Sequence, residues 1–150
     1  MVWQAVIAGG IAYGLLKSRT LSHDETVQST YDALQDQVSS DATIYADHSD
    51  DAENPRGEVS GLDKVPDIVV KSRLDNNLIV EVETADSLSD RRSEAREQLR
   101  DFSKSSYRRV LVMPPSQEDH DAVKEFVQTE FEELDGELYA ATPEGVTDYL

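Results

Sequence analysis

The sequence predicts a mixed α/β domain over residues 21–150, with a central sheet flanked by helices, and an apolar N-terminal helix over residues 1–20. Two observations lead to this class. Apolar residues recur at helical spacing in three stretches, and short stretches with the pattern of β-strands lie between them. The predicted order is helix, strand, hairpin, helix, strand, helix, strand. A length of 150 residues fits one domain.

The first stretch, residues 2–16, is VWQAVIAGGIAYGLL, and Lys17 and Arg19 follow it. As a helix it would span about 22 Å, less than the ~30 Å hydrocarbon core of a bilayer. The basic residues after it would keep the rest of the chain in the cytoplasm. Two interpretations stay open: a short membrane anchor at the inner face, and a helix docked in a protein interface, including a virion. The spacing of Gly10 and Gly14 permits close helix contact, so a homodimer is also open.

Residues 22–38 are predicted to form an amphipathic helix. Its apolar positions recur at helical intervals: Val27, Tyr31, Leu34 and Val38. Ser22 and Glu25 have the spacing of a capping box, which fixes the start of the helix. Residues 42–46 then read as the first strand. Residues 47–64 form a long polar loop, which is typical of a binding loop or an insertion.

Residues 65–84, VPDIVVKSRLDNNLIVEVET, are predicted to form a β-hairpin with a tight turn at residues 75–77. Side chains alternate between the two faces of a strand, so Asp67 and Lys71 share one face. On the second strand Glu81 and Glu83 share a face. A turn at this position would pair Asp67 with a residue near Glu83, to within a residue or two, and would bring the three carboxylates into one patch.

The second half of the chain continues the alternation of helices and strands. The predicted elements are a helix from Ser87 or Ser89 to about residue 103, a buried strand at 107–113, a helix from Ser116 that ends at Gly136, a strand at 138–141 and a terminal helical turn. The helix that ends near residue 103 would be a crossover between parallel strands.

Three carboxylates on one face of a sheet repel one another and resist ionisation together. Asp67, Glu81 and Glu83 therefore gain from a hard divalent cation that binds carboxylate oxygens. The sequence predicts a Mg²⁺ or Mn²⁺ site at these residues. The alternative is an exposed acidic face without a ligand.

The chain carries 31 acidic and 14 basic residues, a net charge of −17, and its acids are spread along its whole length. This distribution resembles that of proteins from haloarchaea and their viruses, which work in molar salt. At about 1 M salt the Debye length is only about 3 Å, so the overall charge does not exclude a polyanionic partner.

Several catalytic classes lack their characteristic residues. The absence of cysteine excludes disulfides, thiolate metal sites and a cysteine nucleophile. There is no glycine-rich phosphate loop and no G-x-S-x-G motif. His23, His48 and His120 do not have the spacing of a zinc site, and we expect each of them at the surface.

Three motifs in order resemble those of the PD-(D/E)XK nuclease superfamily, over roughly residues 22–114. They are Pro66-Asp67, Glu81-Val82-Glu83, and Gln98 to Phe102, which is similar to the family's QxxxY helix motif. The resemblance implies a restriction-endonuclease-like αβββαβ core and a metal-dependent phosphodiesterase acting on DNA. The chain departs from the pattern at two positions, because Glu83 replaces the motif lysine and Phe102 replaces the usual tyrosine.

The resemblance also implies roles. Asp67 and Glu81 would be metal ligands, and Glu83 would be the general base or a ligand of a second ion. Gln98 would orient water or the phosphate. The transition-state cation would be Lys71 or, as second candidate, Arg96. Many members carry an acidic residue on the first helix, a place that Glu25 could fill, although its capping role explains it equally well.

Basic residues recur at intervals of four along the helix that ends near residue 103: Arg92, Arg96, Arg100 and Lys104. Like charges at this spacing repel one another within a helix, so the stripe needs a partner. A nucleic-acid backbone and acids elsewhere in the chain are equally open. The rival to a nuclease is an inactive nuclease-like fold that serves as a membrane-tethered or virion interaction module.

Overall fold

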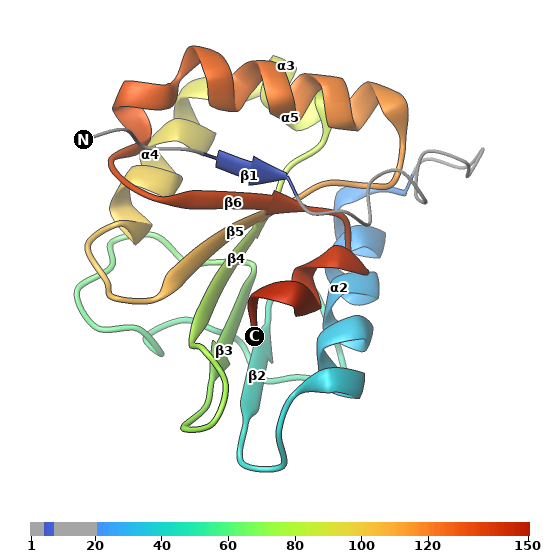
Figure 1. Ribbon diagram of the computed structural model, residues 1–150, viewed down its shortest axis with the longest axis vertical. Helices are drawn as coiled ribbons and strands as arrows, with labels where there is room; N and C mark the ends of the chain where they lie inside the picture. The colour runs from blue at the N-terminus through green and yellow to red at the C-terminus, as the bar shows by residue number, and fades with distance from the viewer. Residues whose placement is uncertain (1–4, 8–20) are drawn as a thin grey trace.

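The computed structural model describes residues 5–7 and 21–150. It contains a mixed sheet in the order β1-β6-β5-β4-β3-β2, with helices on both faces (Figure 1). Its elements are β1 Ala5–Ile7, α2 His23–Gln37, β2 Thr43–Ala46, β3 Ile68–Lys71, β4 Leu78–Val82, α3 Ala85–Asp90, α4 Arg92–Phe102, β5 Arg108–Val112, α5 Gln117–Thr129, the 3-10 helix η1 Phe131–Leu134, β6 Leu138–Ala141 and the 3-10 helix η2 Gly145–Tyr149. The predicted fold class, a mixed sheet flanked by helices, is confirmed.

The sheet has an antiparallel part and a parallel part that meet at β4. Strands β2, β3 and β4 pair antiparallel, and β4, β5, β6 and the short β1 pair parallel. Helices α3 and α4 connect β4 to β5, as parallel pairing requires. From α2 to β5 the order of helix, strand, hairpin, helical connection and strand is as predicted.

Each face of the sheet has its own apolar core. Helix α2 and η2 cover one face, where Val27 and Leu34 pack on Ile68 and Val80. Helices α3, α4 and α5 cover the other face (Figure 1). There the core includes Leu99, Phe102, Val123, Phe126, Leu111 and Ile79. Burial of this kind stabilises a fold by about 25 cal/mol per Å² of apolar surface, so both faces contribute.

The start of α2 is as predicted. Ser22 is its N-cap, its hydroxyl accepts a hydrogen bond from the backbone N–H of Glu25, and the Glu25 carboxylate accepts one from the N–H of Ser22. This capping box places the first turn of α2, and with it His23 and Asp24, at one end of the sheet.

The single helix predicted from residue 87 or 89 to 103 is wrong. Two helices lie there: α3 is capped by Thr84, and α4 follows after a break at Arg91, whose φ of −136° and ψ of 42° are not helical. The capping box of Thr84 and Ser87 starts α3 before either predicted cap. Arg91 therefore lies at the junction of the two helices.

The tight hairpin turn at residues 75–77 is also wrong. Strands β3 and β4 pair with Ile68 opposite Val80, and residues 72–77 connect them as a longer loop. Side-chain hydrogen bonds stabilise this loop, since the Asn77 side chain accepts from the N–H of Ser72 and the Asp75 carboxylate accepts from the N–H of Ser39. The register therefore brings Asp67 beside Glu81 rather than beside Glu83.

The predicted N-terminal helix is wrong where the structure describes it, because Ala5–Ile7 form β1, which pairs with β6. The rest of residues 1–20 lies outside the described residues. Within residues 5–7 and 21–150, no helix is both long and apolar enough to cross a membrane.

Candidate functional site

A cavity of about 360 Å³ opens at the end of the sheet where β3 begins and β4 ends. Asp67, Glu81 and Glu83 line it from the sheet. The start of α2, the loop after β2, the α3–α4 junction and α4 contribute the other polar lining residues: His23, Asp24, His48, Arg91, Glu94 and Gln98. Segments far apart in the sequence thus meet at one site.

The three carboxylates are buried, although they line an open cavity. Asp67 is 6% exposed, Glu81 4% and Glu83 5%. The backbone N–H of Asp67 donates to Glu81 Oε2 at 3.3 Å, and the N–H of Val82 donates to Asp67 Oδ2 at 2.8 Å. These contacts place the carboxylates of Asp67 and Glu81 side by side across the two strands. The alternative of a solvated acidic face is therefore wrong for these residues.

Burial makes it costly for these acids to be charged. Burial is the main cause that raises the pKa of Glu81 well above its ordinary value, and the charges of Asp67 and Glu83 add to it. Burial also raises the pKa of Glu83 to about 7. The Ser87 hydroxyl donates a hydrogen bond of 2.5 Å to Glu83 Oε2, which lowers this pKa and offsets part of the rise. A positive group near these oxygens would stabilise their ionised forms.

This burial predicts a pH-dependent stability that Glu83→Gln removes. The native state keeps the Glu83 proton up to a pKa of about 7, whereas the unfolded state loses it near 4.5, so native stability falls as pH rises between these values. The fall due to Glu83 is about 3 kcal/mol. We expect Glu83→Gln to be more stable than the native chain at pH 8, by up to that amount, and to lose this advantage near pH 4.5.

The measurement is the free energy of unfolding by guanidinium chloride at both pH values, with EDTA present to exclude metal ions. An identical pH dependence in the two chains would show that Glu83 ionises in the native state as it does in the unfolded chain.

His23 lies inside the site, contrary to the prediction that it is a surface residue. Its Nε2 donates to Asp67 Oδ2 at 3.2 Å. This hydrogen bond is the main cause that raises the pKa of His23 to about 9, against the opposing effect of burial. The capping box fixes the imidazole at the first position of α2, so it faces the carboxylates. The sequence offered one clue, a histidine directly after a helix N-cap, and it is a weak one.

Gln98 lines the cavity from α4, as the motif suggested. Lys71 does not: it lies at the other end of β3, where its Nζ is 3.2 Å from Glu58 Oε1. Arg96 also lies elsewhere, with its Nη1 3.2 Å from Glu130 Oε2. Glu25 has its capping role at the start of α2, and the cavity is lined instead by its neighbour Asp24. The structure therefore brings Asp67, Glu81, Glu83 and Gln98 together and leaves out both predicted cations.

Arg91 lines the cavity, where Lys71 or Arg96 had been predicted. Within the described part of the chain, it is the only arginine or lysine that lines this cavity. Its side chain is 66% exposed, and its Nε lies 3.9 Å from Glu94 Oε2. Its charge lowers the pKa of Glu83, which is opposite to the effect of burial. Sequence reasoning missed Arg91 because the helix break that positions it was not predicted.

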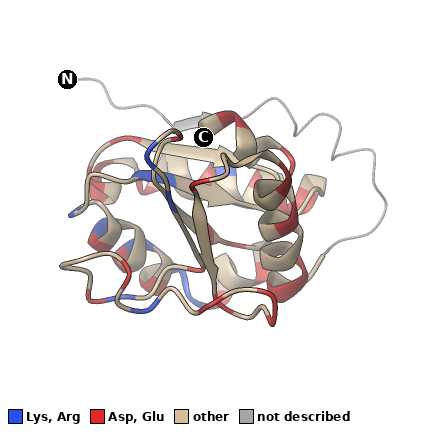
Figure 2. Ribbon diagram, turned by 90° about the horizontal axis from the view of Figure 1, so that it is seen from below, with Lys and Arg blue, Asp and Glu red and all other residues tan. Residues whose placement is uncertain are grey.

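The basic stripe, which runs along α4 and ends at Lys104 just beyond it, is paired with acids of the same chain. Arg92 binds Glu125 and Glu130, Arg96 binds Glu130, Arg100 lies near Glu133, and Lys104 binds Asp63 and Asp101. These are the partners that the second alternative predicted, and the alternative of a nucleic-acid backbone stays a prediction. Acidic positions lie on elements at both faces of the sheet (Figure 2), so such partners are close at hand.

Comparison of the chain with protein-family models, curated proteins and solved structures finds no match. The proposals below therefore depend on the motifs and on the geometry of the site.

Proposed function

We propose that this chain is a Mg²⁺- or Mn²⁺-dependent nuclease that hydrolyses phosphodiester bonds of DNA, with a restriction-endonuclease-like core of the PD-(D/E)XK type. One observation carries the proposal: three buried carboxylates, Asp67, Glu81 and Glu83, face one open cavity. The order of helices and strands and the placement of Gln98 support it. Without a cation these acids reduce the stability of the fold, so a ligand explains them better than packing does.

The donor set suits a hard divalent cation. Asp67 and Glu81 would hold it with carboxylate oxygens, which Mg²⁺ and Mn²⁺ prefer. When bound, the ion supplies Lewis-acid polarisation of the phosphate and a lower pKa for an attacking water. Asp67 is oriented by two donors, the N–H of Val82 and Nε2 of His23, so its carboxylate is held in place before any ion arrives.

Glu83 would accept the proton of the attacking water. A general base works best with a pKa near the working pH, and the pKa of Glu83 is about 7. The hydroxyl of Ser87 donates to one of its oxygens, Oε2, and thereby orients the carboxylate. Gln98, on the α4 side of the cavity, would orient the water or the phosphate by hydrogen bonds.

Arg91 would take the part of the missing motif lysine. A cation near the scissile phosphate stabilises the charge that develops in the transition state. We expect Arg91→Ala to lower kcat by about 10²-fold or more, because one electrostatic donor is lost. We expect Arg91→Lys to recover part of the rate.

Affinity for Mn²⁺, measured by titration calorimetry, should stay within about twofold in both Arg91 variants, because Arg91 is not a ligand. Arg56→Ala is a matched control, since this exposed arginine lies outside the cavity lining. An unchanged kcat in Arg91→Ala would show that Arg91 has no catalytic role and would leave the assignment of the metal ligands unaffected.

The proposed function is tested by incubating the full chain with linear and single-stranded DNA and Mn²⁺ or Mg²⁺, in about 2 M KCl to screen its self-repulsion. Cleavage that requires the metal and stops with EDTA is the expected result. Chains that remain folded but leave both DNA forms intact with both metals would contradict it.

A second candidate is the inactive nuclease-like module, tethered to the inner face of a membrane or packed in a virion. The observation that favours it is the self-paired stripe on α4, whose charges are partly neutralised by the chain's own acids. Titration with Mn²⁺ distinguishes the candidates, because the nuclease must bind Mn²⁺ at Asp67 and Glu81 and an interaction module need not.

A further inference from the structure

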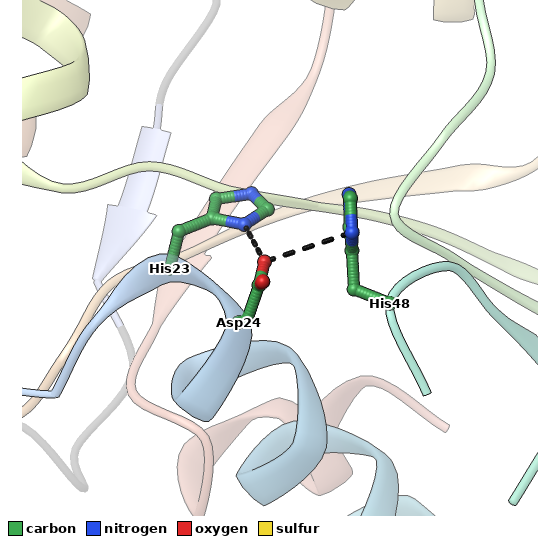
Figure 3. A group of neighbouring side chains, drawn as sticks. All are labelled: His23, Asp24 and His48. Atoms are coloured by element: carbon green, nitrogen blue, oxygen red, sulfur yellow. Dashed lines mark hydrogen bonds and ion pairs between the residues drawn. The ribbon is translucent and has the colours of Figure 1, made fainter. Parts of the chain in front are cut away.

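Beside the three carboxylates lies a second group of metal-binding side chains, His23, Asp24 and His48 (Figure 3). His23 and Asp24 come from the first turn of α2, and His48 comes from the loop after β2. One ligand atom from each of the three residues lies within 4.8 Å of the other two. Asp24 stands between the two imidazoles and faces both of them (Figure 3).

The distances approach those around a bound ion. Asp24 Oδ1 is 3.0 Å from His23 Nδ1 and 3.7 Å from His48 Nδ1. Ligand atoms about 2.1 Å from a zinc ion lie roughly 3.0–3.6 Å apart. No two of the three ligand atoms lie more than 4.8 Å apart, so His48 would need to move by at most roughly 1 to 2 Å to share an ion with the other two. It lies in a loop, and its side chain is 46% exposed, so little packing opposes such a shift.

The contacts of Nε2, the other ring nitrogen of each imidazole, are a second and independent indication of a metal site. His23 Nε2 is 3.2 Å from Asp67 Oδ2, and His48 Nε2 is 3.6 Å from Asp47 Oδ2. Metal-binding histidines almost always donate their second N–H to a carboxylate or carbonyl, which fixes the tautomer and frees the other nitrogen for the ion. Both imidazoles here have a carboxylate on that side and turn Nδ1 toward Asp24.

We propose that His23 Nδ1, Asp24 and His48 Nδ1 bind a transition-metal ion such as Zn²⁺ or Co²⁺, at a site distinct from the carboxylates of Asp67 and Glu81. Two imidazoles and one carboxylate favour these ions over Mg²⁺, which prefers oxygen ligands alone. The site has three protein ligands and lines the open cavity, so water fills the remaining positions. This assignment concerns binding and does not depend on DNA hydrolysis.

The backbone also accounts for the position of His48. Its φ of 59° lies in the left-handed region, which few residues other than glycine adopt. Asn adopts this conformation readily, so His48→Asn removes the imidazole and keeps the turn. Asp24→Asn keeps the size of its side chain and removes the charge. These two variants test the site with little risk to the fold.

The experiment titrates the full chain with Co²⁺ and follows the visible absorption that imidazole coordination gives, with Zn²⁺ as competitor and excess Mg²⁺ to occupy the carboxylates. We expect one bound ion. We expect its affinity to fall at least tenfold in His48→Asn and in Asp24→Asn, because each variant loses a ligand. His120→Asn, which changes the histidine outside the cluster, should leave it unchanged.

Glu81→Gln separates this site from the carboxylate site. It should retain the Co²⁺ spectrum while its affinity for Mn²⁺ falls. Equal Co²⁺ affinity in the native chain, His48→Asn and Asp24→Asn would overturn the proposal and leave the cluster as a set of ion pairs. Loss of the Co²⁺ spectrum in Glu81→Gln alone would assign the ion to the carboxylates instead.

Discussion

Replacing Asp67 by asparagine is expected to abolish Mn²⁺-dependent stabilisation and to lower DNA cleavage by at least about 10³-fold. A metal ion contributes several kcal/mol to the stability of such a transition state, and about 4 kcal/mol corresponds to a factor of 10³. Asparagine keeps the size of the side chain and an oxygen that accepts from the N–H of Val82, so the hairpin should stay folded. The variant relieves repulsion among the buried carboxylates but also loses the ion pair with His23, so the stability of the metal-free variant should stay close to that of the native chain.

The measurements are the melting temperature with EDTA and with saturating Mn²⁺, and the initial rate of cleavage. Asp36→Asn makes the same chemical change at an exposed position on α2 and should match the native chain in both. A Mn²⁺-induced rise in the melting temperature that persists in Asp67→Asn would place the ion at other ligands.

Replacing Arg109 by methionine is expected to have the largest effect on stability, a loss of about 3–5 kcal/mol. Arg109 is 4% exposed, and it donates to four backbone carbonyls. Its Nη1 binds the carbonyls of Leu99 and Leu134 at 2.6 Å each, and its Nη2 binds those of Asp135 and Glu137 at 3.1 Å each. Burial lowers the pKa of Arg109 to about 10, so the guanidinium stays charged at neutral pH.

Methionine fills much of the same volume and leaves these four carbonyls without their donor. The contacts to Leu99 and Leu134 are buried, so water cannot easily replace the donor there. Leu99 and Leu134 lie near the C-terminal ends of α4 and η1, where a cation is also favoured by the helix dipole. The effect is measured by guanidinium unfolding at neutral pH. Arg108→Met is the control, because Arg108 is partly exposed and packs over the ring of Tyr139; it should cost about 1 kcal/mol or less. Equal losses in the two variants would show that the carbonyl contacts of Arg109 add nothing.

Local signals predicted most of the fold. The capping box of Ser22 and Glu25 placed the start of α2, and the apolar run at residues 110–113 identified β5. Alternation along the hairpin correctly placed Asp67 and Glu81 on one face. Each lies two residues from a member of the core beneath α4, Val69 for Asp67 and Ile79 for Glu81. These features depend on neighbours within a few residues, so periodicity and capping rules describe them well.

The failures involve contacts between distant segments. The helix break at Arg91 depends on α3 starting at the Thr84 cap and packing beside α5. The loop at residues 72–77 is stabilised by Ser39 and Asp41, which lie before β2. No short-range pattern contains these partners, so the sequence suggested a continuous helix and a tight turn.

The residues of the candidate site likewise fall into those that local signals predicted and those that depend on contacts between distant segments. The sequence predicted that the three carboxylates lie in one patch, and the resemblance suggested Gln98 beside them; all four line the cavity. His23, His48 and Arg91 reach the cavity only because α2, the loop after β2 and the α3–α4 junction converge there. The stripe on α4 was visible in the sequence, but its partners, such as Glu130, lie more than thirty residues away.

The most direct test of the proposed metal nuclease is a single-turnover cleavage assay with the native full-length chain and Asp67→Asn at equal concentrations. Both are incubated with plasmid and single-stranded DNA in about 2 M KCl, with Mn²⁺ or with EDTA, after circular dichroism has shown that both are folded. Cleavage by the native chain with Mn²⁺, and its loss in Asp67→Asn and in EDTA, is the predicted result. Intact DNA in every reaction of the folded native chain, or equal cleavage by both chains, would contradict the assignment of Asp67, Glu81 and Glu83 as the catalytic metal site.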